Sequence, residues 1–277
     1  MRYVVARYYF DTIFKEQAAE DFVSGLFNAT APLEANGLTY AVGNVELEEH
    51  QNYKFIRGTL GRLRSDESID VYNKDARTFE KQDLAEVADR LAEFLIEPST
   101  HLIFIQEDYE LKPHTVINKL MKIYANASQL GTLKVDFVLQ EGDVYEALKR
   151  WDKVRTIKFR DLRPTNPSSK DSFKEIEDML KETGSVKTDI TFHAPPKKDD
   201  EDEVGLNYDS QLIRQPLALA SHGYGNAKLE GEENGKRVEV KTQKFVRRVE
   251  VDFTKDGALE RIVQEVEEIQ ADTNEEE

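Results

Sequence analysis

The stretch that decides the fold is residues 101–163, HLIFIQEDYELKPHTVINKLMKIYANASQLGTLKVDFVLQEGDVYEALKRWDKVRTIKFRDLR. It predicts strand, helix, strand, helix and strand in turn, over residues 101–106, 113–125, 134–140, 143–151 and 156–162. The strand runs are short, rich in β-branched and aromatic residues, and bounded by polar residues. The first helix repeats apolar residues at intervals of three and four and begins on Pro113, which suits a first turn. The alternation predicts an α+β fold of mixed sheets with helices packed on one face, with a ferredoxin-like layer as one candidate arrangement.

The segments on either side extend this pattern. Strands are predicted over residues 2–10, 38–48, 53–63 and 186–193, and helices over residues 16–28, 171–183 and 257–269. Residues 78–96 show the strongest helix pattern of the chain, because apolar residues recur every three or four positions and Pro98 follows as a stop. Gly58 and Gly61 lie inside a strand pattern, where a bulge or a close approach of the backbone explains glycine better than a phosphate loop does.

Beyond residue 195 the composition changes. Two prolines and a run of charged residues predict a linker, and residues 217–228 and 237–253 predict strands around an Asn234-Gly235 turn. We interpret these strands as a β-rich C-terminal extension, or as edge strands that complete the first sheet. The predicted organisation is therefore an α+β core over residues 1–195 and an acidic linker over residues 196–205. A β-rich extension over residues 206–254 and a terminal helix with an acidic tail over residues 255–277 follow.

The composition limits the class of protein. A chain of 277 residues can bury a substantial core, and 39% apolar with 33% charged residues is typical of a globular protein with a solvated surface. No apolar run approaches the roughly 20 residues that span a bilayer, and the N-terminal residues lack the features of a signal peptide. There is no cysteine, which excludes disulfides and thiolate sites. We expect a cytoplasmic protein without membrane insertion.

The net charge of −16 is unevenly distributed along the chain. Residues 199–203 and 265–277 together hold twelve acids and no base, and the remaining residues carry a net charge of −4. Overall charge governs solubility and long-range steering, whereas binding depends on the local surface. The acidity therefore lowers the expectation of nucleic-acid binding without excluding it.

Catalytic signatures are absent from the sequence. It contains no Walker-type loop, no GxGxxG after a strand and no HExxH. The histidines are scattered singly, at His50, His101, His114, His193 and His222. A structural role is the stronger interpretation for each, and His222, beside Gly223-Tyr224-Gly225, is the first that we would test for catalysis or metal binding. We expect no enzymatic activity, no cofactor and no metal.

Two basic clusters are the strongest functional signal. The first has seven bases against two acids: Lys149, Arg150, Lys153, Arg155, Lys158, Arg160 and Arg163. The second contains Lys236, Arg237, Lys241, Lys244, Arg247 and Arg248. In the predicted strand over residues 156–162, Lys158 and Arg160 alternate with apolar residues and so share an outward face. If both clusters lie on one face, they could neutralise several phosphates without reading bases, unless nearby carboxylates pair with these cations instead.

Several segments resemble a group of bacterial phage-defence proteins that includes RexA and KwaB. The similarity is one of pattern and order over most of the chain, in residues 55–64 (FIRGTLGRLR), 101–106, 113–124, 136–143, 158–167 (KFRDLRPTNP), 217–225 (LALASHGYG) and 240–242. The resemblance implies an α+β fold, a homodimer and sequence-independent binding of double-stranded DNA in anti-phage defence, alongside a second defence-system protein. It transfers no specific functional residue, and the acidity of this chain departs from what such a DNA binder should have.

Three functional interpretations follow. The first is a non-enzymatic protein that binds the backbone of double-stranded DNA through the two basic clusters. The second is a protein-interaction module, such as a regulatory subunit or an acidic inhibitor, in which the basic residues form internal salt bridges. The third is a hydrolase or nuclease whose site is assembled from scattered residues, and it has the least support.

Overall fold

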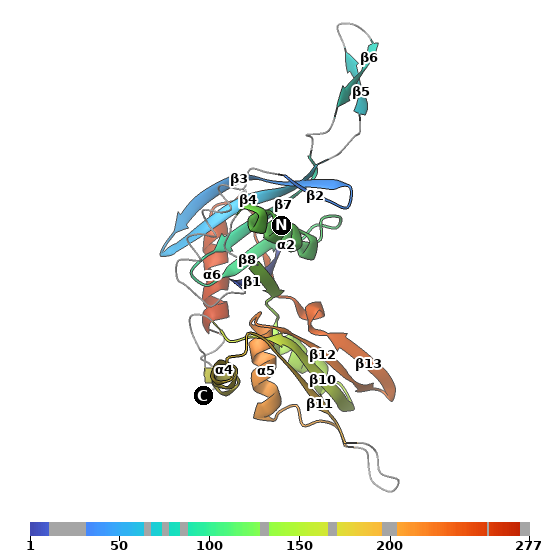
Figure 1. The fold of residues 1–277 in the computed structure, drawn as a ribbon, viewed down its shortest axis with the longest axis vertical. Helices are drawn as coiled ribbons and strands as arrows, with labels where there is room; N and C mark the ends of the chain where they lie inside the picture. Colours follow the sequence, from blue (N-terminus) through green and yellow to red (C-terminus); the bar gives the residue numbers. More distant parts are fainter. Residues whose placement is uncertain are drawn as a thin grey trace. The chain divides into compact units, whose positions relative to one another are not determined.

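The structure is a computed structural model, and it describes residues 1–10, 32–63, 68–73, 78–83, 88–127, 133–165, 171–195, 204–253 and 255–271. Its elements are both helical and extended, so the predicted α+β fold is confirmed (Figure 1). The chain divides into two compact units: unit 1 comprises residues 1–3, 9–134 and 250–252, and unit 2 comprises residues 4–8, 135–249 and 253–277. The predicted helix over residues 16–28 lies outside the described residues. None of the described helices is both long and apolar enough to cross a membrane.

Unit 1 is built on a curled antiparallel sheet. Its strands lie in the order β8 (Leu102–Gln106), β7 (Ala88–Glu97), β4 (Tyr53–Leu63), β3 (Leu38–His50) and β2 (Leu33–Ala35). β1 (Arg2–Phe10) lies next to β8, and β5 (Ser68–Asn73) pairs with β6 (Thr78–Asp83) as a separate two-stranded sheet. The helix α2 (Pro113–Ala127) belongs to the same unit. The core contains Phe55, Leu60, Phe94 and Phe104, all fully buried.

The predicted helix over residues 78–96 is wrong, because residues 78–83 form β6 and residues 88–96 lie in β7. β7 is a central strand between β4 and β8, and its residues from Phe94 to Ile96 are buried in succession. A strand buried on both faces reads as a continuous apolar run, and periodicity alone does not distinguish it from a buried helix. Tertiary pairing overrides local helix propensity in this segment.

Gly58 shows how closely β4 and β7 pack. A Cβ atom at Gly58 would lie 2.4 Å from Cζ of Phe94, so only glycine leaves room for this ring. The close approach inferred from the sequence at Gly58 is therefore confirmed.

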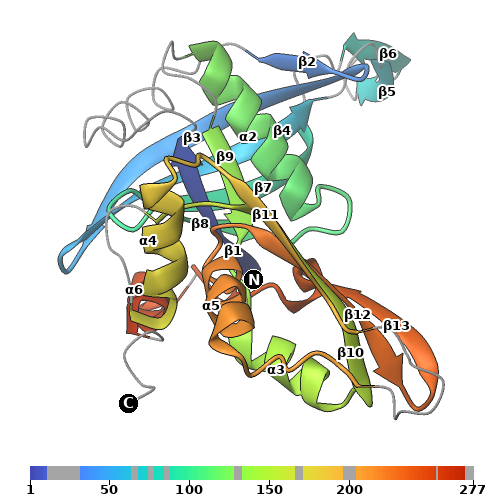
Figure 2. The ribbon, with the colours of Figure 1, turned by 60° about the horizontal axis from the view of Figure 1, so that its bottom comes forward.

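Unit 2 is built on a four-stranded antiparallel sheet with the strand order β11-β10-β12-β13. These strands are β10 (Lys153–Leu162), β11 (Thr188–His193), β12 (Asn226–Glu233) and β13 (Lys236–Lys241). Three helices pack on one face of this sheet: α3 (Glu141–Lys149), α4 (Lys174–Glu182) and α5 (Gln211–Ser221) (Figure 2). Their apolar residues join Val154, Ile157 and Phe159 of β10 in one core. The helices are thus on one face, as predicted.

The remaining elements include two strands that pair with β1, a terminal helix and two short 3₁₀ turns. β14 (Arg248–Glu250) and β9 (Leu133–Phe137) both pair with β1, and α6 (Ala258–Ala271) confirms the predicted terminal helix. The turns η1 (Asp171–Phe173) and η2 (Thr242–Phe245) precede α4 and follow β13.

Two further predictions are corrected in unit 2. The strands of residues 101–193 do not share one sheet, since β8 and β9 pair with β1 whereas β10 and β11 lie in the four-stranded sheet. In a ferredoxin-like layer the first and second strands are separated by the third. Here the successive strands β10 and β11 are directly paired, so this sheet has a different strand order. Of the strand predicted over residues 217–228, residues 217–221 instead end the helix α5 and residues 226–228 begin β12. Residues 215–221 are buried in succession, so this part of the helix shows no alternation of apolar and polar positions.

The segment after residue 206 completes the sheet of β10. β12 pairs with β10 and β13 pairs with β12, as in the edge-strand interpretation. Asn234 and Gly235 both have positive φ, 52° and 70°, which confirms the predicted turn between these strands. Most of the acidic linker predicted over residues 196–205, and the acidic tail after residue 271, lie outside the described residues.

Candidate nucleic-acid interface

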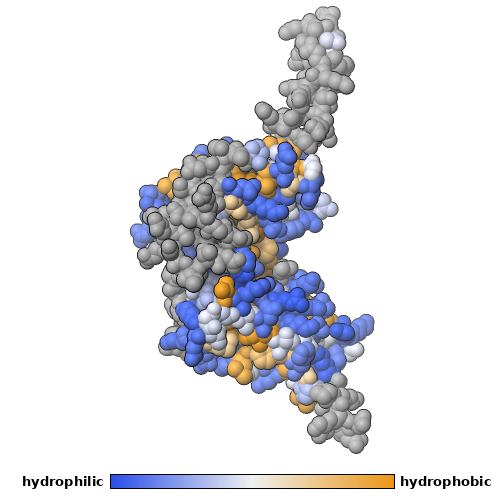
Figure 3. Space-filling model, viewed as in Figure 1, coloured by the Kyte–Doolittle hydropathy of each residue, from blue (hydrophilic) through white to orange (hydrophobic). Residues whose placement is uncertain are grey.

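The four-stranded sheet of unit 2 has one face without helices, which we call the open face. On β10, Thr156, Lys158 and Arg160 point away from the core, because they alternate with the buried Ile157 and Phe159. Cross-strand pairing extends this face from β10 to the other strands, since directly paired residues point to the same side of a sheet. In Figure 3, hydrophilic side chains predominate over β13.

The charges of the open face follow from the strand register. It places six cations and three carboxylates on this face: Lys153, Lys158, Arg160, Lys228, Arg237 and Lys241, with Glu230, Glu232 and Glu239. The face is therefore slightly basic within a strongly acidic chain.

Lysines from three strands form a row across this face. Lys158 of β10 is the direct partner of Lys228 of β12, and Lys228 is the direct partner of Lys241 of β13. Neighbouring strands lie about 4.8 Å apart, so the row covers about 10 Å. Like charges directly opposite each other are unfavourable, and this row therefore needs compensating anions.

Glu230 supplies most of that compensation. Its carboxylate accepts from Lys228 Nζ at 3.0 Å, from Arg237 Nη2 at 3.1 Å and from Lys158 Nζ at 3.4 Å. The bonds from Lys228 and Arg237, together with the charge of Lys158, lower the pKa of Glu230 to about 2. Lys228 also bonds to Glu239 at 2.9 Å, and the bonds to Glu239 and Glu230 raise the pKa of this lysine.

Other cations of the two clusters are exposed without an ion pair to any described residue. They are Arg160 on the open face, Lys236 and Lys241 on β13, Lys244 in η2, and Arg150 after α3. The structure therefore places Arg160 and Lys241, one from each predicted cluster, on the same sheet face with available charge.

The rest of the predicted site residues are distributed differently. Lys149 pairs with Glu146 in α3, Lys153 begins β10, and Arg155 binds Glu232 at 2.9 Å. Arg248 donates to the carbonyl of Val246, next to β14.

Arg163 and Arg247 are each only 7% exposed, and neither belongs to the open face. Arg163 Nε donates to the carbonyl of Asp161. Arg247 forms ion pairs with Glu265 and Glu268 of α6.

The sequence reasoning did not identify Lys228 or Glu230. Both lie in β12, where Lys228, Glu230 and Glu232 alternate with Ala227, Leu229 and Gly231. This alternation could have identified both residues. The strand predicted over residues 217–228 ends before most of the alternating positions, so they were missed. Trp151 packs against Gly231 and the apolar core and does not lie on the open face.

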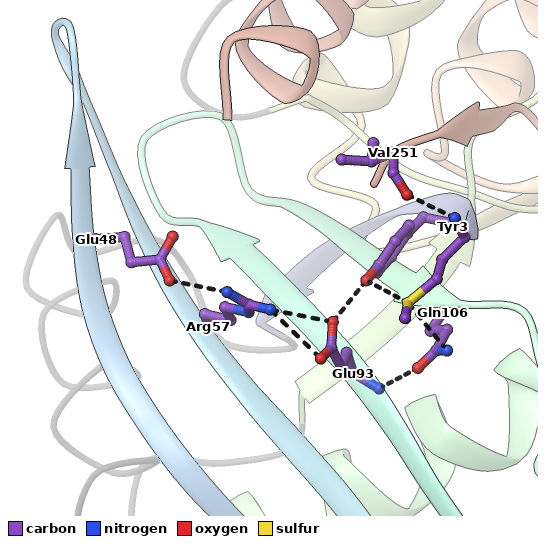
Figure 4. Close-up of polar contacts among 7 residues, drawn as sticks. Tyr3, Glu48, Arg57, Glu93, Gln106 and Val251 are labelled. Carbon is purple, nitrogen blue, oxygen red and sulfur yellow. Dashed lines mark hydrogen bonds and ion pairs between the residues drawn. The ribbon is translucent and has the colours of Figure 1, made fainter. Parts of the chain in front are cut away.

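A second charged network lies in unit 1 and ties its strands together (Figure 4). The hydroxyl of Tyr3 donates to Glu93 Oε2 at 2.7 Å, and Arg57 bonds to Glu93 at 3.4 Å and to Glu48 at 3.3 Å. Gln106 Oε1 accepts from the backbone N–H of Glu93. Burial, followed by the hydrogen bond to Glu93, raises the pKa of Tyr3 well above its usual value. The network links β1, β3, β4, β7 and β8, and we assign it a structural role.

Within the described residues, no three histidine or acidic side chains are arranged to hold a metal ion. A comparison with protein families finds that the model of DUF4747, a domain of unknown function, matches residues 26–268. A comparison with curated proteins finds no match.

Proposed function

This chain belongs to the DUF4747 family, whose description assigns no activity, and we propose that its open face binds the phosphate backbone of double-stranded DNA without reading the bases. The proposal includes no catalysis and no cofactor, and it places the protein in the cytoplasm.

The row of Lys158, Lys228 and Lys241 is the observation that carries this proposal. Three ammonium groups on adjacent strands repel one another, and a polyanion laid across the sheet would relieve that repulsion. Arg160, exposed beside the row, would add a fourth contact. Phosphate contacts of this kind give affinity without sequence information.

The composition of the open face favours backbone binding over base stacking. On the described strands, its only ring is the imidazole of His193, because Phe159 and Phe192 belong to the helix-covered side. Proteins that bind single strands use aromatic side chains as stacking platforms. The face therefore suits a duplex, in which the bases are already stacked.

A salt series with the full chain tests the proposal. We expect a fluorescent duplex of about 20 base pairs to bind at about 50 mM salt, with a log–log slope near −3 for three or four phosphates. Lys158→Glu with Arg160→Glu should abolish binding, whereas Lys54→Glu, an exposed control on β4, should not. No detectable binding at that salt concentration would reject the proposal.

The ion pairs around Glu230 and Glu232 favour a second candidate, a protein-interaction or regulatory module. In that case the cations stabilise the fold through ion pairs. The double variant would then have a lower free energy of unfolding, and the parent chain would not bind DNA. The homodimer and the phage-defence setting remain predictions from the resemblance.

A further inference from the structure

Unit 2 contains a cavity of about 270 Å³ that the proposed DNA-binding function does not use. Its wall is formed by the N-terminus of α3, the C-terminal end of α5, η1, Arg247 and Ile269 of α6. His222, the histidine singled out in the sequence, lies in this wall and is 6% exposed.

The N-terminus of α3 presents a backbone donor to the cavity. Gln140 is the N-cap residue and makes no side-chain cap hydrogen bond, and Glu141 and Gly142 also line the cavity. The amide of Asp143 already donates to the carbonyl of Gln140 and that of Gln140 to the carbonyl of Phe245, so Gly142 supplies the donor for a ligand. The helix dipole favours an anion beside it. The space around Gly142 is open, since a Cβ atom there would meet nothing within 4 Å.

Ser221 is an independent sign that a polar ligand belongs in this cavity. It lines the wall, is 2% exposed, and its hydroxyl has no hydrogen-bond partner among the described residues. A buried hydroxyl without a partner is destabilising, and native structures normally satisfy it with protein, water or ligand.

The charge of the wall limits the ligand to a weakly charged group. Arg247 lines the cavity, but its guanidinium already bonds to Glu265 and, at 2.9 Å, to Glu268. Glu141 adds one carboxylate to the wall. The wall thus offers hydrogen-bond donors but no net positive charge. The lack of positive charge favours a singly charged anion over a phosphate dianion.

Apolar residues form the rest of the wall. Val138, Leu139 and Ile269 line the cavity, each no more than 5% exposed. They would hold a short hydrocarbon segment beside the polar end. A volume of about 270 Å³ is close to that of small-ligand pockets.

We propose that this cavity binds a small aliphatic carboxylic acid. Its carboxylate would accept from the hydroxyl of Ser221 and from the amide of Gly142 at the N-terminus of α3, and its chain would pack against Val138, Leu139 and Ile269. The inference does not depend on the open face or on DNA.

Isothermal titration of hexanoate into the full chain tests it, with acetate and hexanol as comparison ligands. We expect saturable binding of hexanoate, weaker binding of acetate by about fourfold for each methylene removed, and no binding of hexanol. Ser221→Ala should weaken hexanoate binding about tenfold, because it removes a hydrogen bond to a charged group.

Ser185→Ala is the matched control, since Ser185 lies in unit 2 and bonds locally to Lys187 and Thr188. A thermal melt of each variant verifies the fold. The inference fails if hexanoate shows no saturable binding up to about 10 mM, if hexanol binds equally well, or if Ser221→Ala binds as tightly as the parent chain.

Discussion

Lys158 and Lys228 lie directly opposite each other on adjacent antiparallel strands, and both ammonium groups bond to the same carboxylate oxygen of Glu230, at 3.4 and 3.0 Å. The two lysines are 70 positions apart in the sequence, and the carboxylate between them offsets the repulsion between their ammonium groups. The same carboxylate would compete with any phosphate that approaches the open face.

Glu230→Gln should therefore raise the affinity for duplex DNA by several-fold at low salt. The change removes one negative charge and releases Lys158 and Arg237 to contact phosphate, while Lys228 keeps its ion pair with Glu239. Fluorescence anisotropy with the full chain measures it, and Glu49→Gln, an exposed carboxylate paired with Lys54, is the control. An unchanged or weaker affinity would show that Glu230 does not compete with DNA.

The stability that Glu230 contributes should depend on pH in the acid range. Its pKa is about 2 in the folded chain, below the usual 4.3 of an unfolded glutamate. Because the folded pKa is the lower one, the contribution is complete above about pH 4.5 and is lost as the pH falls towards 2. Urea unfolding at pH 6, 4 and 3 should show the parent chain and Glu230→Gln converging in free energy of unfolding as the pH falls, and a constant difference would contradict the assignment.

Gly58→Ala should destabilise the chain by about 1–3 kcal/mol, because the new methyl group overlaps the ring of Phe94. Phe94→Leu should relieve part of that loss in the double variant, since the two residues are in direct contact. Urea midpoints of the four chains give the coupling energy. Gly43→Ala is the control, as a Cβ atom there meets nothing within 4 Å. Strict additivity would contradict the register of β4 and β7.

Arg247→Ala should cost about 2–3 kcal/mol, because it removes charged hydrogen bonds to Glu265, only 3% exposed, and leaves Arg261 at 3.2 Å as the other partner of that carboxylate. Arg248→Ala, one residue further and exposed, should change stability much less. The free energies of unfolding of both variants test the contrast. Equal losses would mean that the environments of these neighbouring arginines are not as the structure places them.

Much of the fold could be predicted from local patterns. The paired strands β3 and β4, the helices α2, α3, α4 and α6, and the turn at Asn234-Gly235 follow from periodicity and turn chemistry. The errors are at β7 and α5, which contain runs of consecutive buried residues over residues 94–96 and 215–221. A fully buried segment has no polar face, so its period cannot be read from the sequence.

In the candidate site, too, some features could be predicted from the local sequence and others could not. The alternation in β10 was sufficient to predict that Lys158 and Arg160 share an outward face, because side-chain direction along a strand is a local property. The burial of Arg163 and Arg247 was not predictable, since it depends on partners as distant as Glu265.

The sequence by itself determined the α+β class, most of the elements and the two runs of basic residues. Only the tertiary structure decided that β12 lies between β10 and β13, and therefore that Lys158, Lys228 and Lys241 form one row with Glu230 beside it. The physical reason is that strand order and register arise from pairing between segments far apart in the chain, and no local pattern encodes which segments will meet.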